Sequence, residues 1–109
     1  MGRFKILVAF YFLIFAGVLS AQHASLKGRL SDSEGRGLEF GNMILFEAAD
    51  SNVVKVELSG EEGDFRFDGL MPGRYFLKSS YVGYETGIKD QILLEPNTET
   101  DLGQLTLAS

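Results

Sequence analysis

The sequence predicts an all-β fold, a seven-stranded antiparallel Greek-key sandwich of immunoglobulin-like architecture. Three observations lead to this prediction. Apolar and polar residues alternate through most of the chain after residue 22, as they do in strands with one buried face. Turn-forming sequences rich in glycine recur roughly every 8–12 residues, a spacing that is typical of sandwiches. In the same region no segment of about ten residues or more follows the helix period, which disfavours folds that alternate strands with helices.

Each expected strand alternates apolar and polar residues and ends at a turn-forming sequence. The seven expected strands are Ser25–Ser31, Gly41–Glu47, Val53–Ser59, Asp64–Asp68, Tyr75–Val82, Ile88–Leu94 and Leu102–Leu107. The expected turns are Ser33–Gly37, Ala49–Asn52, Gly60–Gly63, Met71–Gly73, Gly83–Gly87 and Glu95–Asn97. Glycine permits positive φ in such turns, and Pro72 presets φ in the fourth of them.

The alternation also predicts which side chains face the core. In the first strand leucines alternate with cations, in the third Lys55 and Glu57 separate three apolar residues, and in the fourth two phenylalanines flank Arg66. The residues expected to point inward are Leu26, Leu30, Leu38, Met43, Leu45, Val54, Val56, Leu58, Phe65, Phe67, Leu70, Tyr75, Leu77, Tyr81, Ile92, Leu94, Leu105 and Leu107. Burying one phenylalanine contributes about 1.5–3 kcal/mol, so the two rings of the fourth strand should be sensitive positions.

Residues 1–21 are expected to be a cleaved signal peptide with a helical apolar run, and residues 22–109 the mature domain. Arg3 and Lys5 precede the 14 uncharged residues of Ile6–Leu19, and small residues follow them. This run is shorter than the ~20 apolar residues that a membrane-spanning helix needs, which disfavours a retained anchor. Cleavage is expected after Ala21, with Ser20 as the alternative. We therefore expect an exported protein with no membrane span in the mature chain.

Composition argues against several classes of function. The chain has 15 acidic and 10 basic side chains, a net charge of −5, whereas nucleic-acid binding needs clustered cations. It has no cysteine and one histidine, His23, which excludes thiol nucleophiles, disulfides and multi-histidine metal sites. No glycine-rich loop precedes a helix that could bind phosphate. We therefore expect no enzyme, no catalytic residue, no cofactor, no metal and no nucleic-acid partner.

Acidic residues flank two of the predicted turns. Asp32 and Glu34 lie at the first, and Glu61, Glu62 and Asp64 lie at the third. Oxygen ligands of this kind bind calcium, but their spacing fits no EF-hand loop. Solvated turn residues are the simpler interpretation.

Five segments form an ordered set of motifs: Gly28–Asp32 with Gly35, Leu38–Met43, Glu62–Leu77, Ser80–Glu85 and Asp101–Leu107. In this order they resemble the G-x-V-x-D-x-x-G, L-P-F-A-N-V, D-G-x-F-x-F-x-x-L-x-P-G-x-Y-x-L, S-Y-V-G-Y-E and L-G-x-I-x-L motifs of carboxypeptidase-regulatory-like domains. The chain departs from this pattern where Gly37 and Glu39 replace usual prolines, where Gly41 replaces a usual alanine, and where Ser79 replaces a common apolar residue.

The resemblance implies a prealbumin-like sandwich in a non-catalytic exported module. Such domains precede the plug and barrel of TonB-dependent outer-membrane receptors in Gram-negative bacteria, or lie beside metallocarboxypeptidases, and Ser80–Glu85 is most similar to the receptor version. The expected partner is an envelope or outer-membrane protein such as a receptor barrel, and the expected location is the periplasm or the outer membrane. The chain is expected to be either a free-standing module or a fragment of a larger receptor.

Four apolar side chains are expected outside the core and form the candidate interaction surface: Ile44, Phe46, Phe76 and Tyr84. Neighbouring residues of a strand point to opposite faces, so inward Met43 and Leu45 direct Ile44 and Phe46 outward. One interpretation is a docking face for a partner protein. The alternatives are coverage by other parts of the chain, or isolated exposed side chains without a role.

A surface that stacks sugars is a further alternative. It would use the rings of Phe76, Tyr81 or Tyr84 and would make the protein a glycan-binding module, a carbohydrate-binding module of the cell envelope. Sugar-binding domains share this fold class, which is an argument from fold alone. The absence of tryptophan disfavours it.

Overall fold

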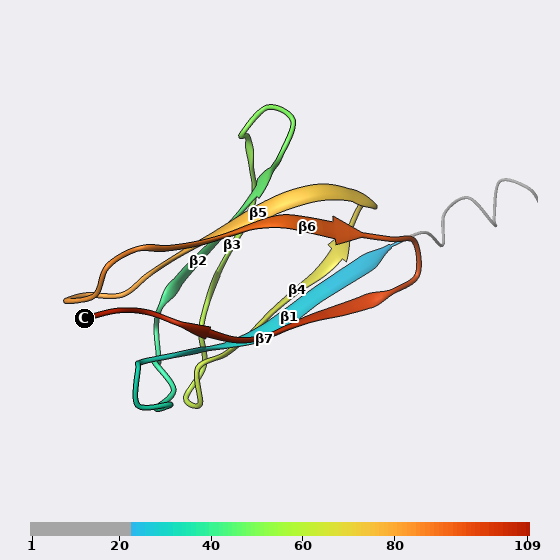
Figure 1. Ribbon diagram of the computed structural model, residues 1–109. Coiled ribbons are helices and arrows are strands. Elements are labelled where there is room, and N and C mark those ends of the chain that lie inside the picture. Colours follow the sequence, from blue (N-terminus) through green and yellow to red (C-terminus); the bar gives the residue numbers. More distant parts are fainter. Residues whose placement is uncertain (1–22) are drawn as a thin grey trace, which may run out of the picture.

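The computed structural model describes residues 23–109 (Figure 1). Its elements are β1 (Ala24–Ser31), β2 (Asn42–Glu47), β3 (Val53–Leu58), β4 (Asp64–Leu70), β5 (Gly73–Ser80), β6 (Gly87–Leu94) and β7 (Glu99–Thr106). Strands therefore form near all seven predicted positions. The main shifts are that β5 ends before Val82 and that β7 begins before Leu102. The predicted signal peptide, residues 1–21, lies outside the described residues.

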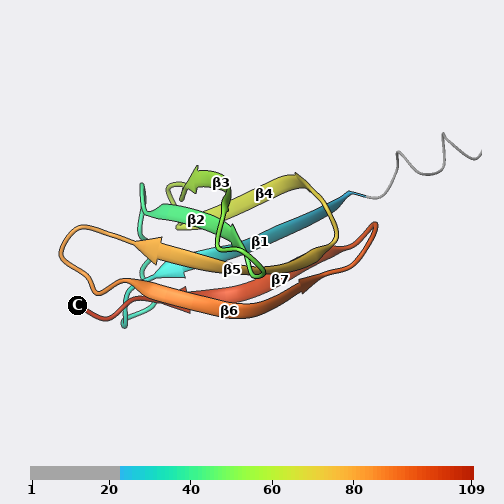
Figure 2. The same ribbon diagram turned by 90° about the horizontal axis from the view of Figure 1, so that it is seen from above.

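The seven strands form two sheets, one with the order β4-β1-β7 and one with the order β3-β2-β5-β6. Figure 1 shows the two sheets as layers, and Figure 2 shows β3, β2, β5 and β6 side by side in that order. The predicted all-β sandwich is thus confirmed.

The prediction that every pairing is antiparallel is wrong. β1 pairs antiparallel with β4 but parallel with β7, through pairs such as Lys27 with Asp101 and Leu30 with Leu105. The reason is the connectivity. A chain that reverses direction at each of its six connections brings its first and last strands into the same direction, because an even number of reversals restores it. The three-stranded sheet is therefore mixed, with a parallel pair between β1 and the edge strand β7.

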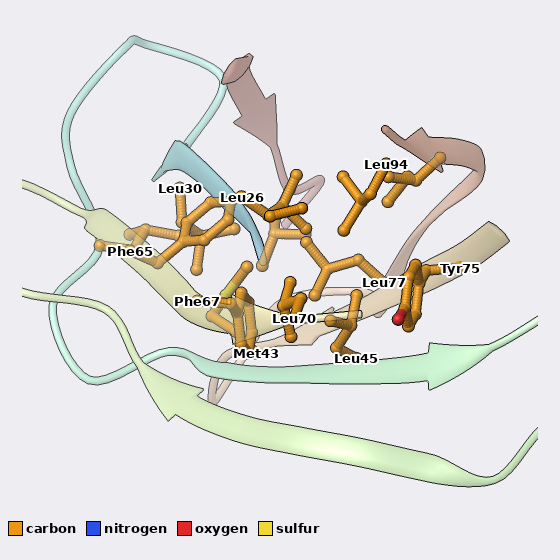
Figure 3. Close-up of a cluster of buried hydrophobic side chains, with 14 residues drawn as sticks. Leu26, Leu30, Met43, Leu45, Phe65, Phe67, Leu70, Tyr75, Leu77 and Leu94 are labelled. Atoms are coloured by element: carbon orange, nitrogen blue, oxygen red, sulfur yellow. The ribbon is translucent and has the colours of Figure 1, made fainter. Parts of the chain in front are cut away.

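The core lies between the two sheets (Figure 3). Its members are the buried side chains of Ala24, Leu26, Leu30, Leu38, Met43, Leu45, Phe65, Phe67, Leu70, Tyr75, Leu77, Ile92, Leu94 and Leu107. Phe65 and Phe67 make an edge-to-face contact, with ring centroids 6.2 Å apart and ring planes at 66°. Tyr81 and Leu105, which were predicted to be inside, are partly buried and pack against this core. The inward phase is therefore confirmed for most strands.

The inward phase predicted for β3 is wrong. Its three apolar side chains are between 38% and 56% exposed: Val54, Val56 and Leu58. Lys55 pairs instead with the buried Leu45, so it takes the core-facing side, where its amine donates a hydrogen bond to the carbonyl oxygen of Asp68. β3 is an edge strand, and an inward-pointing charge there opposes pairing with another chain. The alternation is therefore kept, but the pairing with β2 gives it the phase opposite to the one predicted.

Two buried backbone contacts close the end of the sandwich near Gly63. Gly63 has a φ of 84°, and a Cβ there would overlap the carbonyl oxygen of Leu30. The Leu30 amide donates to the Gly63 carbonyl at 2.8 Å. Nearby, the buried Ser59 hydroxyl accepts from the amide of Gly41 at 2.7 Å and donates to the carbonyl of Leu38. The Ser59 contacts hold the loop before β2 against the loop before β4, and the Leu30–Gly63 contact holds β1 against the latter loop.

Tyr75 closes the opposite end of the core. Its ring is buried and its hydroxyl donates to the carbonyl oxygen of Met71 at 2.6 Å. Burial raises the pKa of the Tyr75 hydroxyl, and the negative charge of Glu47 adds to this rise. The ring therefore packs in the core while its polar atom remains hydrogen-bonded, as buried tyrosines require.

Candidate interaction surface

The outer face of the three-stranded sheet is charged. Arg66, Lys27 and Asp101 lie side by side across β4, β1 and β7. Arg66 pairs with Asp68 at 2.8 Å and with Glu99, and Lys27 pairs with Glu99 at 3.6 Å. The hydrogen bond from Arg66 and the charge of Lys27 lower the pKa of the Glu99 carboxyl. Opposite charges thus offset one another, which is typical of a solvated surface.

The outer face of the four-stranded sheet is apolar. Seven side chains from its four strands define what we call the apolar face: Ile44, Phe46, Val56, Leu58, Phe76, Ile88 and Leu93. Their shared side follows from pairing, because Val56, Ile44, Lys78 and Ile88 form one row across the sheet. Ile88 is 67% exposed and Val56 is 55% exposed. The two outer faces of the sandwich therefore differ in kind.

Two phenylalanine rings lie at the middle of the apolar face. Phe46 and Phe76 are directly opposite each other on β2 and β5. Their rings stack with centroids 4.8 Å apart and planes within 7°. Both side chains remain partly exposed. Because one face of each ring lies against the other ring, the pair forms a rigid apolar stack that β2 and β5 hold in place.

Two cations on β5 flank this pair of stacked rings. Arg74 and Lys78 lie two residues before and two residues after Phe76, on the same side of the strand. Both are exposed, and within residues 23–109 neither makes an ion pair or a side-chain hydrogen bond. By contrast, Lys27 and Arg66 on the charged face have carboxylate partners. The cations of the apolar face are thus available to a partner.

A cavity of about 450 Å³ adjoins one end of the apolar face. Its walls include Glu47, Met71, Pro72, Arg74 and Tyr75. The Arg74 side chain lines the cavity and also flanks the apolar face. No ion pair joins it to Glu47 in the part of the chain that the structure describes. The cavity therefore extends the apolar face around the 71–73 turn.

Three of the four predicted surface residues come together on this face. Ile44, Phe46 and Phe76 are neighbours in it. Tyr84 lies elsewhere, in the loop after β5. Its ring meets Tyr81 edge-on at 5.5 Å and 74°, and both pack against the core.

The sequence interpretation missed four apolar members of the face: Val56, Leu58, Ile88 and Leu93. The β3 pair was assigned to the core. Leu93 could have been found, because Ile92 and Leu94 were expected inside and the residue between them then points outward. Ile88 could not, because the same alternation places it on the side of Ile92, and the irregularity of β6 near Gln91 turns it outward.

The acidic turn residues have structural partners. The Asp32 carboxylate accepts the amides of Glu34 and Arg36, each at 2.9 Å, and pairs with the Arg36 guanidinium at 3.2 Å. These bonds, the Arg36 amide foremost, lower the pKa of Asp32 despite its burial.

Among residues 23–109 there is no group of three histidine, cysteine or acidic residues placed to hold a metal. The same residues include no helix that is long and apolar enough to cross a membrane.

Comparison with known proteins identifies the domain type. Residues 25–108 match the family model described as carboxypeptidase regulatory-like domain. A search among curated proteins finds no match.

Solved structures with a similar fold include a hydroxyquinol 1,2-dioxygenase from Pseudomonas putida, the TIE protein of Bacillus anthracis and a putative carbohydrate binding protein from Bacteroides uniformis. Their TM-scores are 0.62, 0.63 and 0.60, with 10%, 17% and 10% sequence identity. The matches cover 82%, 81% and 77% of this chain, but only 57%, 17% and 40% of those proteins. At this identity the likeness shows the prealbumin-like sandwich fold alone.

Proposed function

Because the chain belongs to the carboxypeptidase regulatory-like domain family, we propose that it is a non-enzymatic interaction module of the cell envelope. The module binds an outer-membrane protein through the apolar face. The observation that carries this proposal is the contrast between the two outer faces. The face of the three-stranded sheet carries ion pairs, whereas the face of the four-stranded sheet is apolar around the Phe46–Phe76 stack. The export signal that the sequence predicts in residues 1–21 supports the envelope location.

The size of the apolar face suits a modest interface. Four strands about 4.8 Å apart and about six residues long, at ~3.3 Å each, cover roughly 400 Å². Exposed apolar patches of a few hundred Å² often mark interaction sites. A standard interface buries about 800 Å² per partner, so this face alone would give a weak or tethered complex.

The partner that we favour is a receptor barrel of the TonB-dependent kind. Support comes from Ser80–Glu85, which resembles the version of this domain found in such receptors. A domain that is tethered to its barrel, or held close to it, needs only a small docking face because the effective concentration is high. The roughly 400 Å² of the apolar face meets this requirement.

A carbohydrate partner is the second candidate. The observation in its favour is that the rings of Phe46 and Phe76 remain partly exposed, since sugars pack against exposed aromatic rings. Binding to a glycan array, with loss of binding in Phe76→Ala, would support it. An array without hits removes this candidate and leaves the protein partner.

The proposal is tested by cross-linking in the native cells. A photo-crosslinking phenylalanine analogue replaces Phe46 on the apolar face, or Val82 in the loop after β5, which is 94% exposed and outside the face. We expect an adduct with an outer-membrane protein from position 46 and not from position 82. Phe46→Asp should weaken the same association, whereas Val82→Asp should not. Equal adducts from both positions, or none from position 46, would refute the proposal.

A further inference from the structure

We propose that the apolar face recognises an extended acidic segment of its partner, in which two carboxylates four residues apart flank an apolar side chain. The observations that specify this segment are the order and spacing of Arg74, Phe76 and Lys78 along β5. The inference rests on the proposed function and adds the chemistry of the partner to it.

The spacing along β5 sets the pattern. Residues i, i+2 and i+4 of a strand share one face, so Arg74 and Lys78 lie ~13 Å apart with Phe76 midway. An extended partner segment has the same repeat. A segment of the form acidic-x-apolar-x-acidic, aligned along β5, therefore places a carboxylate at each cation and an apolar group on the Phe46–Phe76 stack. A helix would need eight or nine residues to cover about the same distance.

Charge complementarity points to an acidic occupant. Arg74 and Lys78 make no ion pair within residues 23–109, although the chain as a whole carries a net charge of −5. Asp90 and Gln91 lie near Phe76 at the irregular part of β6, and Asp90 joins neither cation in an ion pair. A second copy packed face to face would set these cations against their equivalents. The face thus favours a carboxylate-bearing partner over itself.

The sheet edges disfavour the alternative of strand addition. On β6, Gln91 has a φ of 55° and the register with β5 shifts between Tyr75 and Leu77. On β3, the register with β2 also shifts, and Lys55 points inward to the carbonyl oxygen of Asp68. Bulges and inward charges are features that block an added strand. The segment therefore lies across the outer face, where side chains make the contacts.

The test is a titration of the isotope-labelled protein, isolated from cells that express the full chain, with capped heptapeptides. The matching peptide is Ser-Glu-Thr-Phe-Thr-Glu-Ser. A control with the same composition, Ser-Thr-Phe-Thr-Glu-Glu-Ser, places the two glutamates side by side. We expect the matching peptide to shift the amide resonances of β2 and β5 and to bind about fivefold more tightly than the control, because only its carboxylates reach both cations.

Charge reversal provides the second arm. Arg74→Glu combined with Lys78→Glu should weaken binding of the matching peptide about five- to twentyfold. The same double variant should bind a peptide with both glutamates replaced by lysine more tightly than the unchanged protein does. Lys89 is an exposed cation that pairs with the buried Leu77, so it lies outside the apolar face. Lys89→Glu should therefore leave the affinity unchanged. The comparison of the two glutamate peptides uses the unchanged protein, so it does not depend on whether any variant folds.

Four results would overturn the inference: no binding, equal binding of the two glutamate peptides, unchanged binding in the charge-reversed variant, or shifts confined to the edges of β3 and β6. Shifts of the same amides with protein concentration alone would assign the face to a second copy instead. If the peptides fail while the cross-link from position 46 persists, the proposed function stands and the acidic-segment inference falls.

Discussion

Replacing Phe67 by alanine should remove a large part of the stability of this domain. Phe67 is fully buried on β4, pairs with Leu26 on β1 and contacts the Phe65 ring edge-to-face at 6.2 Å. The ring occupies the middle of the layer between the sheets (Figure 3). Its neighbours belong to paired strands, which close only partly around the space left behind, so a cavity would remain.

The expected loss is about 3–5 kcal/mol, the usual cost of removing a buried phenylalanine ring. A domain of this size has a free energy of unfolding of roughly 5–10 kcal/mol, so the variant would retain only a few kcal/mol. Phe46→Ala is the matched control, because it makes the same substitution on the apolar face. There the ring is partly exposed, and loss of its stack with Phe76 and part of its burial should cost about 1–2 kcal/mol.

Urea unfolding followed by circular dichroism measures both changes. The midpoint should fall much further for Phe67→Ala than for Phe46→Ala, while the dependence of the unfolding free energy on urea stays the same. Equal losses in the two variants would show that the structure assigns the two rings to the wrong sides of their sheets. A loss below about 1.5 kcal/mol for Phe67→Ala would refute the reasoning from burial.

Three further substitutions test the turns. Gly63→Ala should destabilise the domain by about 2–5 kcal/mol, since its φ of 84° disfavours a side chain and the methyl group would displace the Leu30 carbonyl; a change below 1 kcal/mol in urea unfolding would contradict this. Ser59→Ala should cost about 1–3 kcal/mol in the same assay, because two buried backbone groups lose their partner, and an unchanged midpoint would argue against the contact. The pKa of Asp32 is lowered from 3.8, so its stabilisation is complete above that pH and is lost as the pH falls through the lower, folded value. Asp32→Asn should therefore be less stable at pH 7 and lose less stability on acidification below about pH 4, whereas parallel pH profiles would contradict the role of Arg36.

Local alternation was sufficient to predict the strands and most of the core. Phe65 and Phe67 are two residues apart, so any strand places both rings on one side, and the flanking polar residues leave little choice of side. The glycine and proline turns likewise act within a few residues. This is why the all-β class, the turn positions and the outward direction of Ile44, Phe46 and Phe76 are predictable from the sequence alone.

The sheet order decided what alternation could not. The register of β3 with β2 turns Val56 and Leu58 outward and Lys55 inward, although the same alternation fits the opposite phase. The parallel β1–β7 pair and the meeting of β3, β2, β5 and β6 in one sheet join residues far apart in the chain. Only that meeting turns isolated apolar residues into one face flanked by the exposed cations Arg74 and Lys78. A surface depends on which strands are neighbours, and local sequence does not contain that information.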